Sequence, residues 1–318
     1  MVEKAKIVIG EMVAETGIKK LQNLGYLVCY DPVMPKDIFL DEVRDATAII
    51  VRRYKVDENV LDIAKNLKVV AKHGAGYENI DLEAAKKRGI RLVFTPGANA
   101  NSVAEYTIAL LLDLVKKTSQ MREEYKKGNY DFKDQCRRID LRNKSIGLLG
   151  AGHIGSIVAK ICAFGFGMKV QIFDPYLPED RQIKAPNIQY IRDKDSVIAS
   201  ADFLSLHLPS NQETRGSIDA TFFSKMKPGS YLLNVSRGDL IVEEDLVKAI
   251  QSGHIAGAGL DVSNPEPAKQ DNPLFALEEV VLTPHCAAGT VDAMENMILA
   301  AVEGIDDILH GRIPKHEL

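Results

Sequence analysis

The sequence contains no apolar run long enough to cross a bilayer. Its longest apolar stretch, Val103–Val115, is interrupted by Glu105 and Asp113 and falls short of the roughly 20 residues that a membrane helix needs. The N-terminal residues AKIVIG are typical of a first core strand and not of a signal peptide. Lys315–Leu318 resembles an endoplasmic-reticulum retention signal, which we interpret as coincidence without an entry signal. We therefore expect a cytoplasmic protein.

Cysteine is scarce and neither sign of charge dominates. The four cysteines, at positions 29, 136, 162 and 286, show no metal-ligand spacing and no pairing pattern, so we expect reduced thiols and no metal site. Cys286 adjoins His285, but neighbouring side chains on an extended segment point apart. The net charge of −4 gives no reason to expect nucleic acid or membrane partners. A length of 318 residues with 46% hydrophobic content suits two globular domains.

Two regions of the chain alternate short apolar runs with amphipathic segments. The expected strands are Lys6–Ile9, Leu27–Tyr30, Ala48–Val51, Val69–Lys72, Arg91–Phe94, Ser145–Leu149, Lys169–Phe173, Phe203–His207, Tyr231–Asn234, Gly257–Asp261 and Val280–Leu282. The expected helices are Val13–Leu24, Asp81–Arg88, Asn99–Lys117, Gly155–Phe164, Thr221–Met226, Glu243–Gln251 and Val291–Leu309. This order predicts an α/β protein with two doubly wound parallel sheets and the active-site cleft between them. The polar residues 120–142 are expected to form a surface arm or connector.

Residues 144–174 contain a complete dinucleotide-binding pattern. The strand Ser145–Leu149 runs directly into a G-x-G-x-x-G sequence. Its first glycine, Gly150, allows a tight turn, Gly152 lets the backbone approach a pyrophosphate, and Gly155 lets the next helix pack against the strand. The N-terminus of that helix favours phosphate. The expected cofactor-binding residues of this turn are Gly150, Gly152, His153, Ile154 and Gly155.

An acidic residue completes this pattern and indicates which cofactor it binds. Asp174 ends the second strand, 19 residues after Gly155, close to the roughly 20 expected for the carboxylate that binds the adenosine ribose. The same carboxylate would repel a 2′-phosphate, which favours NAD over NADP. Arg181 lies nearby, so residual use of NADPH stays open. Because both regions alternate strands and helices in the same way, both sheets are expected to be Rossmann-like.

Three ionisable residues follow predicted strands in the second region. Arg237 lies in NVSRG, Glu266 lies in DVSNPEP, and His285 lies in TPH. The carboxyl ends of strands are where open α/β sheets bind their ligands. Individually, Arg237 could belong to a surface ion pair, Glu266 could be a solvated loop acid, and His285 could be a structural histidine. Together with a dinucleotide site they indicate a redox enzyme.

The reduction of a ketone explains why these three residue types are needed. Negative charge develops on the carbonyl oxygen, and a protonated His285 can donate a proton there. Glu266, if hydrogen-bonded to the ring, would favour the charged imidazolium. Arg237 can hold a substrate carboxylate through two parallel hydrogen bonds. In the reverse direction, neutral His285 would accept the hydroxyl proton.

Nearly the whole chain resembles the D-isomer-specific 2-hydroxyacid dehydrogenase family, especially its phosphoglycerate dehydrogenases and glyoxylate/hydroxypyruvate reductases. The motifs that carry the resemblance are HGAGYENID at 73–81, NSVAE at 101–105, GAGHIG, Asp174, HLP at 207–209, NVSRG, LDV at 260–262, Glu266 and TPH. The resemblance implies an NAD-dependent oxidoreductase that acts on the CH–OH group of 2-hydroxy acids. It implies reversible hydride transfer between NADH and a small 2-keto acid.

The resemblance also assigns residues, domains and an assembly. It makes Arg237, Glu266 and His285 the substrate-binding arginine, the partner of the histidine and the acid/base, and it implies a carboxylate cradle at Gly74, Ala75 and Gly76. Further expected NAD contacts are His207, Pro209, Thr214, Val235, Ser236, Asp261 and His285, with Asp261 near the carboxamide. Residues 1–99 and 285–318 are expected to form a substrate-binding domain around an NAD-binding domain at 100–284. A homodimer through the NAD-binding domains is expected.

The sequence leaves the side chain of the substrate open. Arg52, Arg53, Lys72 and His73 fall at predicted strand ends and would suit a second anionic group, with Arg53 as a substrate contact. The candidate substrates are therefore 3-phosphohydroxypyruvate, hydroxypyruvate and glyoxylate. An alternative is a non-enzymatic NAD-sensing protein of the corepressor type. A formate dehydrogenase is disfavoured, because that branch carries glutamine where Glu266 stands.

Overall fold

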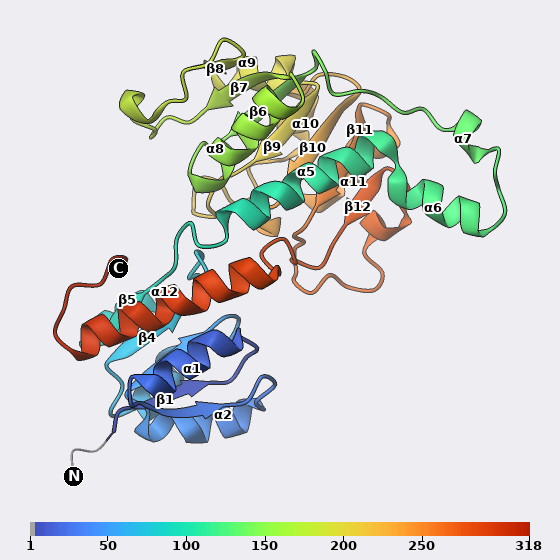
Figure 1. Ribbon diagram of the computed structural model, residues 1–318. Coiled ribbons are helices and arrows are strands. Elements are labelled where there is room, and N and C mark those ends of the chain that lie inside the picture. The colour runs from blue at the N-terminus through green and yellow to red at the C-terminus, as the bar shows by residue number, and fades with distance from the viewer. Residues whose placement is uncertain (1–3) are drawn as a thin grey trace. The chain divides into compact units, whose positions relative to one another are not determined.

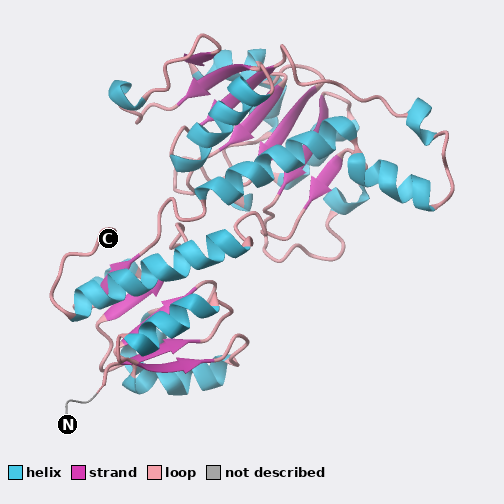
Figure 2. Cartoon of the chain, in the orientation of Figure 1, coloured by secondary structure: helices cyan, strands magenta, loops and turns pink. Residues whose placement is uncertain are grey.

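The computed structural model describes residues 4–318 and consists of two compact units. The terminal unit combines the chain up to Ser102 with Ala288–Leu318, and the central unit is Val103–Ala287. Each unit contains one parallel sheet with helices packed on it (Figures 1 and 2). Among the described residues, no helix is both long and apolar enough to cross a membrane. The predicted fold of two α/β domains with parallel sheets is confirmed.

The terminal unit has a five-stranded sheet in the order β2-β1-β3-β4-β5. Its strands are β1 (Lys6–Ile9), β2 (Leu27–Tyr30), β3 (Ala48–Val51), β4 (Val69–Lys72) and β5 (Arg91–Val93). Its helices are α1 (Glu15–Asn23), α2 (Lys36–Glu42), η1 (Val43–Asp45), α3 (Glu58–Ile63), α4 (Leu82–Lys87) and α12 (Val291–Leu309). All residues of β3 and β4 are buried, as expected for a parallel sheet covered on both faces.

Alternate side chains of these strands enter two separate cores. Ile7 and Ile9 pack with residues of α1 and α12, whereas Val8 packs with residues of α2, α3 and α4 on the opposite face. This alternation follows from the two-residue period of a strand. Helices α1 and α12 pack so closely that a Cβ added at Gly17 would lie 2.1 Å from Ile298 Cγ1. The last residues of the chain lie along β5, where Glu317 pairs with Arg91.

The central unit has a seven-stranded sheet in the order β12-β11-β10-β9-β6-β7-β8. Its strands are β6 (Ser145–Leu149), β7 (Lys169–Phe173), β8 (Ile188–Tyr190), β9 (Phe203–Leu206), β10 (Ser230–Asn234), β11 (Ile255–Leu260) and β12 (Val280–Leu282). Its helices are α6 (Thr118–Lys126), α7 (Phe132–Gln135), α8 (His153–Lys160), η2 (Ile161–Gly165), η3 (Glu179–Arg181), α9 (Lys194–Ser200), α10 (Ala220–Lys225), η4 (Gly238–Leu240), α11 (Glu243–Gln251) and η5 (Pro273–Ala276). Helix α5 (Ala100–Lys116) contains the boundary between the units.

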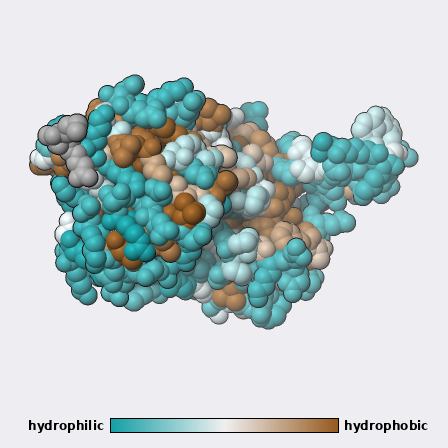
Figure 3. All heavy atoms as spheres, turned by 90° about the horizontal axis from the view of Figure 1, so that it is seen from below, coloured by the Kyte–Doolittle hydropathy of each residue, from teal (hydrophilic) through white to brown (hydrophobic). Residues whose placement is uncertain are grey.

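The polar segment at 120–142 contains two helices that the sequence analysis did not predict. Helix α6 has no buried residue, and the segment projects as an arm, seen on the right in Figures 1 and 3, where its surface is mostly hydrophilic. No apolar face marks these helices in the sequence, since they cover no core of their own chain. Strand β8 was missed because it has three residues and only one of them is buried.

Candidate active site

The glycine-rich turn connects β6 to α8, and its three glycines meet different surroundings. A Cβ added at Gly150 would lie 2.4 Å from the carbonyl oxygen of His207, and one added at Gly155 would lie 2.3 Å from the carbonyl oxygen of Gly150. Nothing lies within 4 Å of a Cβ added at Gly152. Two glycines thus permit internal packing, and the third leaves open space beside the backbone. This arrangement fits the close approach of a pyrophosphate.

Asp174 follows β7 and is fixed against this turn. Its Oδ2 accepts a hydrogen bond from the N–H of Ala151 at 2.8 Å, and its Oδ1 accepts one from the N–H of Tyr176 at 3.0 Å. Each carboxylate oxygen can accept more than one hydrogen bond, so the group retains capacity for ribose hydroxyls. The structure therefore places the expected acid at the glycine turn.

The residues after β9 and β10 are joined by side-chain hydrogen bonds to backbone oxygens. Ser236 Oγ donates to the carbonyl of Leu206 at 2.6 Å, and Thr214 Oγ1 donates to that of Pro209 at 2.6 Å. In the described part of the chain, Nδ1 of His207 is buried without a hydrogen-bond partner. Burial lowers the pKa of His207 to about 4, so the ring is neutral near pH 7. Of the expected cofactor contacts in these two loops, His207 touches the glycine turn.

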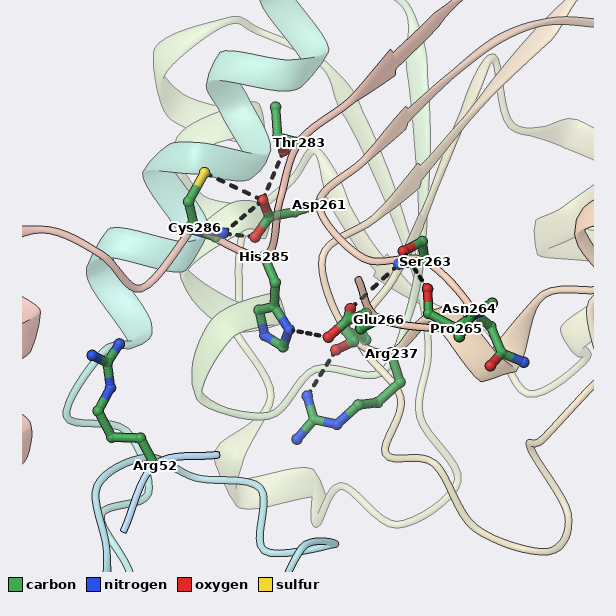
Figure 4. Close-up of polar contacts among 12 residues, drawn as sticks. Arg52, Arg237, Asp261, Ser263, Asn264, Pro265, Glu266, Thr283, His285 and Cys286 are labelled. Carbon is green, nitrogen blue, oxygen red and sulfur yellow. Dashed lines mark hydrogen bonds and ion pairs between the residues drawn. The ribbon is translucent and has the colours of Figure 1, made fainter. Parts of the chain in front are cut away.

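The three expected catalytic residues follow three adjacent strands of the central sheet. Arg237 follows β10, Glu266 follows β11, and His285 follows β12. Because parallel strands present their carboxyl ends at one edge, these loops meet there. His285 Nδ1 lies 2.9 Å from Glu266 Oε2, and the guanidinium of Arg237 extends toward Glu266 (Figure 4). The structure thus brings together three residues that lie up to 48 positions apart in the chain.

Glu266 is held in its ionised form. Partial burial alone would raise its pKa, but the hydrogen bond and charge of His285, the N–H of Ser263 and the charge of Arg237 together lower the pKa of Glu266 below its ordinary value. An ionised carboxylate only accepts hydrogen bonds, so Nδ1 of His285 carries the proton between them. Nε2 is then the nitrogen of His285 that can exchange a proton with a ligand.

The backbone of His285 is fixed by Asp261. His285 adopts a left-handed conformation with φ of 52°, which is unfavourable for a residue with a Cβ. The fully buried carboxylate of Asp261 accepts hydrogen bonds from the N–H of Cys286 at 2.9 Å, the N–H of Ala287 at 2.8 Å and the hydroxyl of Thr283 at 2.7 Å (Figure 4). These bonds hold the segment on both sides of the histidine. The expected contact of Asp261 with a carboxamide stays a prediction.

Gly238 allows the arginine turn and the glutamate turn to touch. A Cβ added there would lie 2.0 Å from the carbonyl oxygen of Ser263. The arginine turn is also tied to β10, because the side-chain amide of Asn234 donates to the carbonyl of Arg237 at 2.8 Å. Val235, which lies between Asn234 and Arg237 in the sequence, is buried. The position of Arg237 therefore depends on backbone contacts that tolerate no larger residue at 238.

The expected carboxylate cradle lies in the terminal unit, after β4. Gly74 has φ of 140°, and its N–H donates to Thr95 Oγ1 at 2.9 Å. Over residues 4–318, the N–H groups of Ala75 and Gly76 donate to no protein acceptor. Ala75 is exposed and Gly76 is partly exposed. The cradle therefore offers two backbone donors and uses the third internally.

The loop after β3 is built on a buried carboxylate that the sequence analysis did not single out. Glu11 is 4% exposed and accepts hydrogen bonds from the N–H groups of Arg52, Arg53 and Tyr54 at 2.7, 2.9 and 3.2 Å. The amide of Asn79 donates to the carbonyl of Tyr54 at 2.6 Å. A glutamate two residues after a buried strand was the available signal. The loop is thus rigid, and the side chain of Arg53 is 86% exposed.

Two of the four expected basic groups have internal roles instead. Lys72 is buried, and its Nζ donates to the carbonyl of Arg52 and, at 2.7 Å, to Oδ1 of Asn79. His73 is also buried, and this burial, with the nearby charge of Arg52, lowers the pKa of His73 to about 4. The basic cluster expected from the sequence is therefore reduced to Arg52 and Arg53.

Comparison with known proteins identifies the family of this chain. Residues 108–287 match the family described as D-isomer specific 2-hydroxyacid dehydrogenase, NAD binding domain. A D-3-phosphoglycerate dehydrogenase of Archaeoglobus fulgidus is 37% identical over 309 residues, which cover 96% of this chain and 58% of that protein. A glyoxylate reductase of Thermofilum pendens is 32% identical over 318 residues, covering 98% and 93% of the two chains.

A solved structure agrees as well. The TT0316 protein from Thermus thermophilus has a TM-score of 0.90 at 33% identity, covering 98% of this chain and 99% of that one. The chain therefore belongs to the D-isomer-specific 2-hydroxyacid dehydrogenase family, as its motifs predicted. NAD(H) is the cofactor of the central unit. The chain spans between 49% and 59% of the length of three phosphoglycerate dehydrogenases to which it is similar.

Proposed function

We propose that this chain is an NAD-dependent D-2-hydroxyacid dehydrogenase that reduces a small 2-keto acid and oxidises the corresponding 2-hydroxy acid. The observation that carries the proposal is the 2.9 Å contact between His285 Nδ1 and Glu266 Oε2, with Arg237 beside it. Relatives named phosphoglycerate dehydrogenase, glyoxylate reductase and hydroxypyruvate reductase support it.

Each side chain has one part in the proposed reaction. Arg237 binds the substrate carboxylate and orients the neighbouring keto group, because a guanidinium matches the two carboxylate oxygens. Bound NADH supplies the hydride for the keto carbon. His285 donates the proton on Nε2 to the carbonyl oxygen, and Glu266 stabilises the imidazolium from Nδ1. In oxidation, neutral His285 accepts the hydroxyl proton. In the terminal unit, the N–H groups of Ala75 and Gly76 are the proposed donors to the substrate.

The substrate is proposed to carry a second anionic group. Arg53 supports this, because Glu11 fixes its backbone while its side chain stays exposed. A phosphate such as that of 3-phosphohydroxypyruvate is the group that suits an arginine best. Hydroxypyruvate and glyoxylate are the alternatives, in which Arg53 only shapes the loop.

The assembly is proposed to be a homodimer through the central units, in the cytoplasm. The arm supports the dimer, because α6 buries no residue in its own chain while Tyr125 and Tyr130 are 69% and 61% exposed. Lys133 Nζ lies 3.6 Å above the ring of Tyr130, so α7 braces the arm. Sedimentation of the wild type and of a Tyr125→Glu, Tyr130→Glu variant tests the dimer, which the variant should weaken.

The proposed location in the cytoplasm has separate support. The four cysteines are unpaired, which fits a reducing compartment.

A kinetic screen tests the proposed activity directly. The purified chain is mixed with NADH or NADPH and each of 3-phosphohydroxypyruvate, hydroxypyruvate, glyoxylate and pyruvate, and the absorbance of the reduced cofactor is followed. Turnover of at least one acid, faster with NADH, is expected. Tight NADH binding without turnover of any acid would instead indicate an NAD-sensing binding protein.

A further inference from the structure

Apart from the contact of Ser263 with Gly238, the turn that carries Glu266 receives little support from packing. Residues 264–267 are exposed, and Ser263 is only partly buried. Within the turn, Ser263 Oγ donates to the carbonyl of Pro265 at 2.9 Å, and the N–H of Ser263 lies 3.3 Å from Glu266 Oε1. These bonds shape the turn but do not attach it to another element. Loops with few buried contacts open more readily than the strands that they join.

One carboxylate attaches both ends of this exposed loop to helix α11. Oε1 of Glu243 accepts a hydrogen bond from the N–H of Asn264 at 2.7 Å, two residues before Glu266. Oε2 of Glu243 accepts one from the side-chain amide of Asn272 at 2.8 Å, at the far end of the loop. Glu243 begins α11, where the regular helix fixes its backbone. A single side chain thus fixes residues 264 and 272 relative to the rest of the central unit.

The chemistry of these contacts requires a carboxylate. The carbonyl oxygen of the Asn272 side chain already accepts the N–H of Leu274 at 2.9 Å, so its amide nitrogen must face Glu243. Both partners of Glu243 are therefore donors, and only a carboxylate accepts from two donors at once through separate oxygens. A glutamine at 243 would accept from one of them and present its own N–H₂ group to the other.

We propose that Glu243 is a positioning residue for the reaction, which holds the Glu266 turn so that Glu266 reaches His285. This inference rests on the proposed function, because it assigns Glu243 an effect only through Glu266. If the turn loosens, Glu266 spends less time at Nδ1 of His285, and the imidazolium loses its counter-charge. The other ionisable groups around this pair in the central unit are Arg237, Asp261, Cys286 and Tyr106.

The pH profile of ketone reduction distinguishes this role from a general loss of stability. Reduction requires protonated His285, so its rate falls on the alkaline side. In Glu243→Gln this alkaline limb should move to lower pH, in the same direction as in Glu266→Gln. A displacement of one pH unit reduces the rate above the limb about tenfold. Glu244→Gln, an exposed neighbour on the same helix turn, is the matched control and should keep the wild-type profile.

The double variant tests whether the effect passes through Glu266. In a Glu266→Gln background, Glu243→Gln should cause no further displacement, because the group that it positions is already gone. Glu243→Asp keeps both acceptor oxygens and should recover part of the wild-type profile. It also provides a second variant if Glu243→Gln folds poorly.

Two different results would separate the two proposals. If Glu266→Gln displaces the limb and Glu243→Gln does not, Glu243 has no positioning role, even if its variant unfolds at a lower temperature. A further displacement by Glu243→Gln in the Glu266→Gln background would overturn it as well. If Glu266→Gln itself leaves the profile unchanged, the proposed proton site is wrong.

Discussion

At the scale of single residues, four carboxylates hold the parts of the site in place. Glu266 faces His285, Asp261 fixes the backbone of that histidine, and Glu243 and Glu11 hold exposed loops. That Arg237, Glu266 and His285 come together could be expected, because each lies in a short motif after one of three adjacent strands; their roles in catalysis stay predictions. The supporting acids could not be predicted in these roles, since Glu243 bonds to residues 21 and 29 positions away.

Asp174 should determine which cofactor is used. Asp174→Ala removes a ribose hydrogen bond and a charge that repels a 2′-phosphate. The KM for NADH should therefore rise, and the preference for NADH over NADPH should become smaller. Asp180→Ala removes an exposed acid from the following segment and should leave the preference unchanged. Steady-state kinetics with both cofactors measure this. A wild type that already prefers NADPH would show that the role of Asp174 is misassigned.

Arg53 should distinguish substrates that carry a second anionic group from those that do not. Arg53→Ala should raise the KM for 3-phosphohydroxypyruvate much more than those for glyoxylate and pyruvate, since only the phosphorylated acid loses a charged contact. Lys55→Ala is a suitable control, because Lys55 is an exposed cation of the same loop. Equal changes for all three acids would mean that Arg53 shapes the loop without contacting the tail. No turnover of the phosphorylated acid by the wild type would leave the reductase alternatives.

At the scale of elements, the strands were the most predictable feature. Seven of them, including β1, β3, β6 and β12, have the expected bounds, because buried parallel strands are short apolar runs between polar segments. The arm helices α6 and α7 were not predicted, because neither has a buried residue to mark its face. A helix without a buried apolar face lacks the periodic pattern by which helices are recognised in a sequence.

The glycine-rich turn should show two separable effects. Gly152 has φ of −66° and open space around it, so Gly152→Ala should leave the unfolding temperature nearly unchanged but weaken NADH binding. In Gly155→Ala, the new Cβ would meet the backbone of Gly150. Such overpacking costs about 1–3 kcal/mol and should lower the unfolding temperature. Thermal unfolding and NADH titration of both variants measure this. Equal effects on stability would contradict the assignment of Gly152 to the cofactor.

At the scale of the whole molecule, two sheets of similar design form two units, and residues 108–287 match an NAD-binding domain. The sequence predicted this duplication from two alternating regions. The dimer, the substrate domain and the cleft between the units stay predictions. They depend on contacts beyond one unit, which the pattern of a single segment does not encode.

Each unit also contains a histidine that should couple folding to pH, the buried His73 and the partly buried His207. Burial lowers the pKa of both His73 and His207 from 6.5 to about 4. The unfolded chain therefore binds protons first, and stability that is present above pH 6.5 is lost as the pH falls toward 4. Each histidine contributes about 3.5 kcal/mol at most, because its pKa falls from 6.5 to about 4 and each pKa unit corresponds to about 1.4 kcal/mol. Urea unfolding between pH 7.5 and roughly pH 4.5 measures this.

Variants assign this pH dependence to His73 and His207. His73→Asn and His207→Asn should each flatten the dependence of the unfolding midpoint on pH, because neither substitute takes up a proton in this range. His153→Asn replaces an exposed ring and should leave the slope unchanged. An unchanged slope in both the His73 and the His207 variant would show that other groups cause the acid sensitivity.

The most direct test of the proposed reaction is the single-turnover rate of His285→Ala. Removal of a general acid should slow reduction about 10²–10⁴-fold, while NADH affinity, measured by fluorescence titration, should stay close to that of the wild type. Cys286→Ala, at the adjacent position, should retain the wild-type rate. A primary isotope effect with deuterated NADH establishes that the chemical step is being observed. If His285→Ala then keeps more than half of the wild-type rate, His285 is not the proton donor and the account is wrong.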